Sequence, residues 1–328
     1  MSAPMRRETG LWQDVSELPD ALAATLHAGD GVVDVAALLG GARRIVATGN
    51  GAAYYVAVAL WLASLEGGGG PEVVAVPSGL VARGAFRWRP GDALLAVSSS
   101  GEFRDLVEAV DGAPPYAIVT ASPDSTLGGR AAARALVTVL NQRAVTHTQA
   151  FCGAVAAALA VWAELTDDAG LRGALARAPE HAGTAVEAAR HWTEDAVDAP
   201  FAVAFGSGPA WAAALEAALL LKEVAGIPAE GVETREGATS AMMALRPGDL
   251  VLSLPTGDDV LLDEAEEACR ARGATVLRAP AIEGADRRLA AITTFPAAAA
   301  LSERIGLARG LDVDRPAWID DYYRVARA

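Results

Sequence analysis

Short apolar runs alternate with longer helical patterns along this chain, and small or polar residues separate them. Residues 44–48 and 93–97 are apolar runs of strand length, each followed by glycine or serine turns, and 116–120 is a third such run. Residues 52–65 are almost wholly apolar and long enough for a buried helix, and 102–110 have helical spacing. This alternation predicts an α/β fold, with parallel strands between helices and ligands at the carboxyl ends of the strands.

The pattern repeats at an offset of 157 residues. RPGD occurs at 89–92 and again at 246–249, and an apolar run follows each copy. The same offset places GNG at 49–51 on GSG at 206–208. A repeat of this length is too long for a solenoid unit, so the sequence predicts two successive domains of one fold.

The repeat and the local composition divide the chain into four parts. Residues 1–29 are expected to form an N-terminal helical segment, and 30–166 the first domain, which ends in a long apolar helix at 148–165. The polar stretch 167–198 is expected to be a helical linker, and 199–328 the second domain with a C-terminal tail.

Composition excludes several functional classes. Of 328 residues 52% are hydrophobic, but no uninterrupted apolar stretch is long enough to cross a membrane, and the first ten residues lack the apolar core of a signal peptide. The two cysteines, Cys152 and Cys269, fall in separate repeats, where buried thiols are more typical than a disulfide. A cytoplasmic protein is therefore expected.

A net charge of −14 opposes binding to nucleic acid or to a membrane surface, because both favour basic partners.

The two glycine turns invite a dinucleotide interpretation that their sequence does not support. The dinucleotide fingerprint needs a third glycine three residues after GxG, where this chain has Tyr54 and Trp211. The only lysine, Lys222, does not follow a glycine, so no P-loop is present either. We expect neither a cofactor nor a metal. The glycines suit a sharp strand-to-helix turn, and the first turn, Gly49-Asn50-Gly51, is also a candidate for ligand contact.

Three consecutive serines follow the apolar run at 93–97. In Ser98-Ser99-Ser100-Gly101-Glu102, hydroxyl groups and successive backbone N–H groups meet at a strand-to-helix turn, which favours binding of a phosphate or another oxyanion. Serine is also a common helix cap, which would account for one or two of the three. Three serines at one strand end favour ligand binding.

Three longer segments carry a family resemblance. VSSSGEFRDLVEAV at 97–110 is similar to an S-x-S-G-E-T-x-D phosphate loop, GPAWAAALEAALLLKEVAGIPAEG at 208–231 to an A-L-E-x-A-L-K-L-K-E stretch, and GLDVDRPAWI at 310–319 to a closing G-x-D-x-D-x-P motif. All three belong to the tandem sugar isomerase (SIS) domain proteins, specifically the isomerase half of glutamine–fructose-6-phosphate amidotransferase and the related fructosamine-6-phosphate deglycases. The resemblance spans nearly the whole chain and implies two flavodoxin-like SIS domains that bind a small carbohydrate derivative.

The resemblance also implies roles for individual residues. Glu223 matches the glutamate that moves a proton between the first two sugar carbons, and a carboxylate on a buried helix has the raised basicity that this work needs. Ser98 and Ser100 match phosphate-contacting serines, and Glu236 matches a glutamate of the family's G-E-x-K-H-G-P loop. The structural alternative for Glu223 is an ion pair on the helix surface with the adjacent Lys222.

The chain departs from the family at several of these positions. Thr239 stands where the family has the ring-opening histidine, and Leu220 stands where it has a lysine. Phe103 replaces the phosphate-loop threonine, and His147 replaces a serine and is a candidate acid or base near neutral pH. An ordinary fructose-6-phosphate aminating isomerase with its glutaminase domain is therefore not expected. The remaining candidates for ligand contact are Phe103, Thr148 and Thr239.

Two functions remain open. In the first, the protein is an isomerase with Glu223 as base, acting on a sugar phosphate or an amino-substituted sugar, or a deglycase that releases an amine from a fructosamine-type adduct. In the second, catalysis is lost and the protein binds a carbohydrate derivative for regulation. Retention of Glu223, Glu230 and Glu236 favours the enzyme.

A homodimer is also expected. Tandem proteins of this resemblance build their sites between subunits, and the chain has more aromatic side chains than its two cores require. The aromatic residues expected at the surface are Phe151, Trp162, Trp318, Tyr322 and Tyr323.

Overall fold

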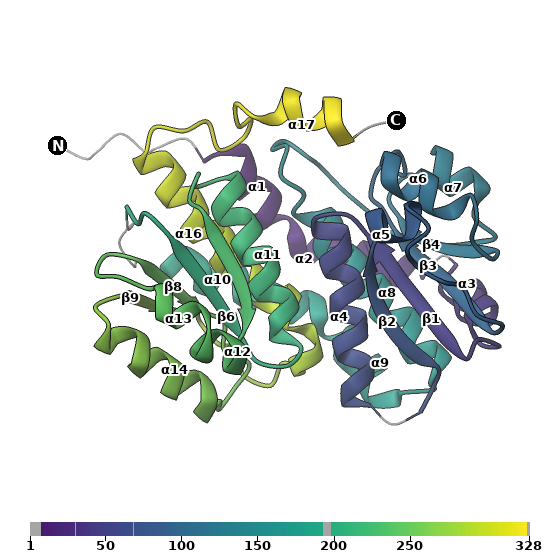
Figure 1. The fold of residues 1–328 in the computed structure, drawn as a ribbon, viewed down its shortest axis with the longest axis horizontal. Coiled ribbons are helices and arrows are strands. Elements are labelled where there is room, and N and C mark those ends of the chain that lie inside the picture. Colours follow the sequence, from purple (N-terminus) through teal and green to yellow (C-terminus); the bar gives the residue numbers. More distant parts are fainter. Residues whose placement is uncertain (1–7, 30, 68, 193–197, 327–328) are drawn as a thin grey trace.

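The computed structural model describes residues 8–29, 31–67, 69–192 and 198–326, and within these ranges the chain forms two parallel sheets (Figure 1). The first sheet has the strand order β2-β1-β3-β4-β5 and the second β7-β6-β8-β9. All their pairings are parallel, which confirms the predicted α/β class. The strands are β1 (Arg44–Gly49), β2 (Glu72–Pro77), β3 (Asp92–Val97), β4 (Tyr116–Thr120), β5 (Ala133–Leu136), β6 (Ala202–Gly206), β7 (Ala229–Glu233), β8 (Leu250–Ser253) and β9 (Thr275–Arg278).

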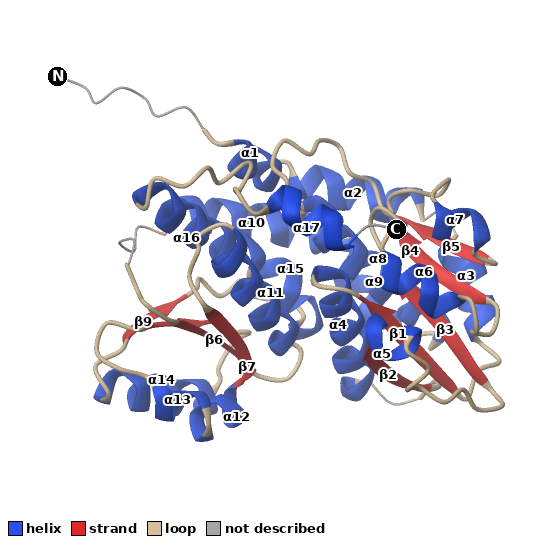
Figure 2. Cartoon of the chain, turned by 45° about the horizontal axis from the view of Figure 1, so that its top comes forward, coloured by secondary structure: helices blue, strands red, loops and turns tan. Residues whose placement is uncertain are grey.

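Helices cover both faces of the sheets, and α4 and α11 pack against each other between the two domains (Figure 2). The helices up to the end of the first domain are α1 (Gly10–Ser16), α2 (Leu18–Ala28), α3 (Val32–Leu39), α4 (Ala52–Glu66), α5 (Ser78–Ala82), α6 (Arg104–Val110), α7 (Thr126–Arg130) and α8 (Gln149–Leu165). The later helices are α9 (Ala169–Ala176), α10 (Ala178–His191), α11 (Ala210–Glu223), α12 (Thr234–Thr239), α13 (Ala241–Ala244), α14 (Val260–Ala271), α15 (Ala290–Thr293), α16 (Phe295–Ala308) and α17 (Ile319–Ala326).

The internal repeat is confirmed in three dimensions. Strands β1, β3 and β4 correspond to β6, β8 and β9 at the predicted offset, and the shared strand order adds a fourth pair, β2 and β7. The equivalent helices α4 and α11 end at Glu66 and Glu223, which are again one repeat apart. The four-part division of the chain stays a prediction, although α10 of the expected linker packs against both α2 and α16.

The apolar helices owe their burial to the helices around them. Helix α8 packs against α2, α3 and α4, so almost every side chain along it is buried. The expectation that Phe151 and Trp162 lie at the surface is therefore wrong: both are 3% exposed, and the Phe151 ring lies 5.7 Å from that of Phe295 between centroids. Both cysteines are buried free thiols, as predicted.

No single helix among the described residues has the length and apolar composition to cross a membrane. Helices α2 and α3 meet the length and composition test only as a pair, which is bent by 63°.

Candidate functional site

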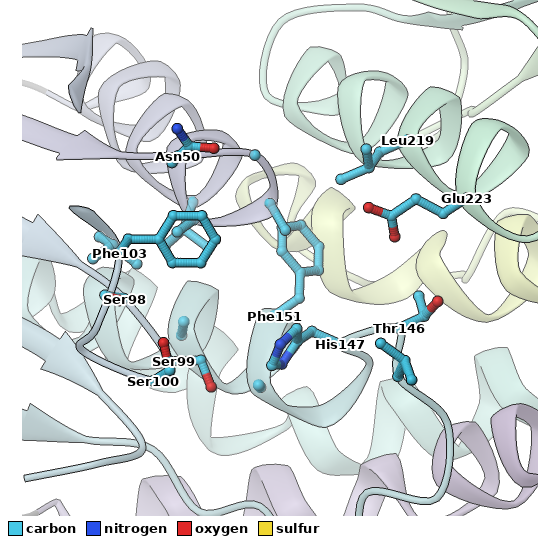
Figure 3. Close-up of a pocket in the computed structure, with 18 of the residues that line it drawn as sticks. Asn50, Ser98, Ser99, Ser100, Phe103, Thr146, His147, Phe151, Leu219 and Glu223 are labelled. Atoms are coloured by element: carbon cyan, nitrogen blue, oxygen red, sulfur yellow. The ribbon is translucent and has the colours of Figure 1, made fainter. Parts of the chain in front are cut away.

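A cavity of about 300 Å³ lies where the carboxyl ends of β1 and β3 face α11 and the C-terminal tail (Figure 3). The first domain supplies the loops after β1 and β3 and the start of α8, and the second domain supplies one face of α11. Strand ends of a parallel sheet are the expected place for a ligand in this fold class. The polar and aromatic residues that line the cavity are Asn50, Ser98, Ser99, Ser100, Phe103, Thr146, His147, Phe151, Glu216, Glu223, Trp318, Tyr322 and Tyr323.

The serine loop lines the cavity with all three of its hydroxyl-bearing side chains. The Ser98 Oγ accepts a hydrogen bond from the Gly101 N–H at 3.0 Å, and the Ser100 Oγ accepts one from the Glu102 N–H at 3.4 Å. Because each of these oxygens acts as an acceptor within the loop, its O–H remains able to donate to a ligand oxygen. The loop can therefore present hydroxyl donors to an anion.

Two features fix the shape of this loop. Gly101 has φ +66°, and a Cβ there would lie only 1.8 Å from the Ser125 Oγ, so the position requires glycine. The Glu102 carboxylate accepts hydrogen bonds from the backbone N–H and the hydroxyl of Thr126, at 2.8 and 2.7 Å. The loop is thereby tied to the start of α7.

The glycine turn after β1 forms a second wall. Gly51 has φ +54°, and a Cβ on Gly49 would lie 2.6 Å from the backbone carbon of Ala53, so both glycines allow the sharp strand-to-helix turn predicted for them. Asn50 and Gly51 line the cavity, and Gly49 is outside its lining. Ligand contact by this turn stays a prediction.

Glu223 reaches the cavity from the end of α11 and faces the loops of the first domain (Figure 3). Burial raises the pKa of this carboxyl to about 7, and the positive charge of Lys222 offsets only part of that effect. Lys222 itself is exposed, and no ion pair joins the two side chains within the described structure. The geometry favours the predicted basic carboxylate over the surface ion pair.

Glu216 lies two turns before Glu223 on the same helix and lines the same cavity. It is 3% exposed, and its Oε2 has no hydrogen-bond partner among the described residues. Burial, and then the negative charge of Glu223, raise the pKa of this carboxyl well above its ordinary value. Sequence reasoning did not single it out, although it is the glutamate of the A-L-E stretch quoted above.

The C-terminal tail forms the aromatic side of the cavity. The Tyr322 ring lies 6.1 Å from the Phe103 ring and 5.6 Å from the Trp318 ring, measured between centroids. The Trp318 Nε1–H donates to the backbone oxygen of Glu223 at 3.2 Å, which ties the tail to the end of α11. Figure 1 shows α17 lying across the top of both domains.

Of the candidates near α8, His147 lines the cavity on the side of the serine loop (Figure 3). Thr148 is buried as the N-terminal cap position of α8 and lies outside the lining, where its neighbour Thr146 takes part instead.

The remaining candidates lie elsewhere in this chain. Glu236 and Thr239 are exposed on the short helix α12, where the Thr239 hydroxyl donates to backbone oxygens of α12 itself. Glu230 is exposed on β7. The cavity of one chain brings together Glu223, the serine loop and His147, and it does not include these three residues. A role for Glu236 or Thr239 stays a prediction.

No protein-family model matches the sequence. The chain is 30% identical, over 94% of its length, to the isomerizing glutamine–fructose-6-phosphate aminotransferase of Leifsonia xyli subsp. xyli, and it spans 58% of that protein. A crystal structure from Silicibacter pomeroyi, of a protein assigned as a phosphosugar isomerase, is 25% identical with a TM-score of 0.78, covering 94% of this chain and all of that one. The C-terminal domain of the Francisella tularensis glucosamine-fructose-6-phosphate aminotransferase shares the fold, at 17% identity and a TM-score of 0.80 over 95% of this chain and all of that one.

Proposed function

The chain is a tandem SIS-domain protein, and we propose that it is a phosphosugar isomerase in which Glu223 moves a proton between adjacent sugar carbons. One observation carries the proposal: a carboxyl group with a pKa of about 7 faces a loop of three serines across a single cavity, and the two come from different domains. The resemblance to the Leifsonia and Silicibacter proteins supports the same reaction class. A general base works best when its pKa lies near the operating pH.

The proposed reaction needs only proton transfers. The Glu223 carboxylate takes the proton from the carbon next to the sugar carbonyl, which leaves an enediolate, and then returns it to the neighbouring carbon. A second proton passes from the hydroxyl oxygen to the former carbonyl oxygen, so that the carbonyl and the hydroxyl exchange places. Ring opening needs a second acid–base group, and His147 is the histidine that lines the cavity. It would do the work that the family assigns to the histidine replaced here by Thr239.

Hydrogen exchange tests the reaction directly. With fructose 6-phosphate, glucose 6-phosphate and related sugar phosphates in D₂O, we expect the protein to introduce deuterium at the carbon next to the carbonyl, as measured by NMR. Binding of a sugar phosphate without any exchange would support the inactive, regulatory alternative instead.

The phosphate group is proposed to contact the serine loop. In Ser98→Ala/Ser100→Ala, each lost hydrogen bond should weaken binding of a phosphorylated sugar by about 0.5–1.5 kcal/mol, because the backbone N–H groups of the loop remain. Calorimetry on one sugar with and without its phosphate measures the effect. Equal affinity of the wild type for both sugars would contradict the phosphate assignment and leave Phe103 as a wall for an uncharged or amino-bearing group.

A deglycase is the second candidate, and the charge of the cavity favours it. The described lining contains neither arginine nor lysine that would repel a substrate amine, and the ionised Glu223 carboxylate can pair with one. The proton transfer between the sugar carbons is the same and gives an imine at the first carbon, which water then hydrolyses to the sugar aldehyde and the free amine. Incubation with a fructosamine 6-phosphate adduct, followed by assay of the free amine, separates this candidate from a simple isomerase.

The expected homodimer is also a proposal. The exposed aromatic residue Tyr322 and the half-buried Trp318 and Tyr323 belong to the tail beside the cavity, where a second chain could cover them. Light scattering on the purified protein should give about twice the chain mass of 33.5 kDa. A monodisperse mass equal to that of one chain would exclude the dimer.

A further inference from the structure

The cavity contains a buried carboxyl group that the proposed proton transfer does not use. Glu216 is almost fully buried on α11, seven residues before Glu223, so the Cα atoms of the two residues are separated by about 10 Å along the helix axis. Its Oε2 has no described hydrogen-bond partner, although buried polar groups in folded proteins are nearly always paired. Both glutamates line the same cavity, one at each end of this stretch of α11.

The residue between Glu216 and Glu223 explains why no cationic side chain follows Glu216 by one turn of α11. Leu220, one turn after Glu216, is fully buried, and it stands where the family resemblance expects a lysine. The only lysine, Lys222, is exposed. The titratable groups that interact electrostatically with Glu216 are Tyr55 of α4, Cys152 of α8, Glu223 and Lys222. Lys222 is the one cation among them, and its effect on the pKa of Glu216 is smaller than those of burial and of Glu223.

A carboxyl group in such surroundings retains its proton, because burial and a neighbouring carboxylate both disfavour the charged form and together outweigh the exposed lysine. A protonated carboxyl group both donates and accepts hydrogen bonds. An oxygen of a neutral sugar, either a hydroxyl or a carbonyl, is the ligand group that satisfies it without bringing a second charge into the cavity.

We propose that Glu216 contacts the substrate as a neutral carboxylic acid, hydrogen-bonding a hydroxyl or carbonyl oxygen of the sugar two helical turns before Glu223 on α11. This inference rests on the proposed function, since it takes the ligand to be a sugar phosphate. It assigns to Glu216 a part in substrate selection, because a polyol can hydrogen-bond a neutral carboxyl group and an apolar or doubly charged group cannot be accommodated beside it.

Two variants test the neutral form against the ionised form. Glu216→Gln keeps a donor and an acceptor and removes the charge, so it should bind fructose 6-phosphate and the open-chain glucitol 6-phosphate within about threefold of the wild type. Glu216→Leu keeps only the apolar volume and should bind both about tenfold more weakly. Glu303→Gln is the control, because Glu303 is a half-buried carboxyl of α16 outside the cavity whose pKa is also raised by burial.

Titration calorimetry on the full-length variants gives the affinities, and infrared difference spectra give an independent signature. The wild type should show the C=O stretch of a protonated carboxylic acid that shifts on ligand binding and is absent from Glu216→Gln. If Glu216→Gln binds as weakly as Glu216→Leu, the ionised form is required and the inference is wrong. If Glu216→Leu binds like the wild type, Glu216 does not contact the sugar. A wild type that binds neither sugar phosphate refutes the proposed function, and the inference with it.

Discussion

Glu223→Gln is expected to lower the turnover of a phosphorylated sugar by at least about a hundredfold while the sugar still binds. The substitution preserves the shape of the side chain and removes the carboxylate that accepts the carbon-bound proton. Steady-state kinetics and deuterium exchange measure the loss, and calorimetry shows whether binding persists. Glu230→Gln is the control, because Glu230 is exposed on β7 and lies outside the cavity. Turnover of Glu223→Gln at the wild-type rate would make Glu223 a structural residue.

The pH dependence of wild-type turnover should show the titration of Glu223. Burial places the pKa of Glu223 at about 7, and only the unprotonated carboxylate can accept a proton. Turnover is therefore expected to rise as the pH increases through about 7 and to level off above it. The residual activity of Glu223→Gln should lack this rise.

The same pKa links Glu223 to stability. Its folded-state pKa is raised above the ordinary value of 4.5, so the folded protein holds this proton more tightly than the unfolded chain does. The resulting stabilisation is complete below about pH 4.5 and is lost as the pH rises through about 7. Above pH 7 we expect Glu223→Gln to be more stable than the wild type, on the order of 2–3 kcal/mol. Thermal melts at pH 4.5 and pH 8 measure this difference, which should disappear at the lower pH.

The sequence pattern identifies central strands and misses edge strands, for a physical reason. β1, β3 and β6 are buried on both faces and appear as continuous apolar runs. β2, β5 and β7 lie at sheet edges, where part of each strand is exposed. β5 and β7 produce no such run, and the run in β2, at 73–76, is not recognised as a strand in the sequence pattern. The repeat places β2 and β7 at the same offset as the central strands.

The sequence predicts residues of the candidate site only where those residues lie within one short motif. The serine loop and Glu223 each belong to such a motif, and the structure places both at one cavity. The contribution of Trp318 and Tyr322 depends on where the tail folds, far from the loops in sequence, and no local pattern contains that information. For Glu216 the signal was present, since a glutamate within an apolar helix pattern is a buried charge that needs an explanation.

The repeat also supplies a second copy of the elements around the cavity, and its chemistry differs from that of the first. Glu66 of α4 corresponds to Glu223, and the turn at Gly208 corresponds to that at Gly51. At this second position the Arg287 Nη2 lies 3.3 Å from the Glu66 Oε1, and a Cβ on Gly208 would lie 2.7 Å from the same nitrogen. The arginine neutralises the carboxylate and occupies the space beside the turn. The serines of the first loop correspond to 255–257, which read Pro-Thr-Gly and supply one hydroxyl instead of three.

Gly101→Ala should disrupt the serine loop more severely than loss of its hydroxyls. An alanine at φ +66° costs roughly 1–2 kcal/mol, and its Cβ would overlap the Ser125 Oγ at 1.8 Å. Ser125 would have to move, although its Oγ caps α7 by accepting from the Gly128 N–H at 3.1 Å, and loss of such a cap costs about 1 kcal/mol. We expect a free energy of unfolding lower by about 2–3 kcal/mol.

The effect on ligand binding should follow from the same displacement. Moving Gly101 shifts the backbone N–H groups that the Ser98→Ala/Ser100→Ala variant leaves in place, so Gly101→Ala should lose more affinity for a sugar phosphate than that double variant does. Gly112→Ala is the matched control, because Gly112 lies just after α6 and a Cβ there meets nothing within 4 Å. Denaturant unfolding and calorimetry on the three variants measure both effects. If Gly101→Ala binds fructose 6-phosphate as tightly as Gly112→Ala, the phosphate group does not contact the serine loop.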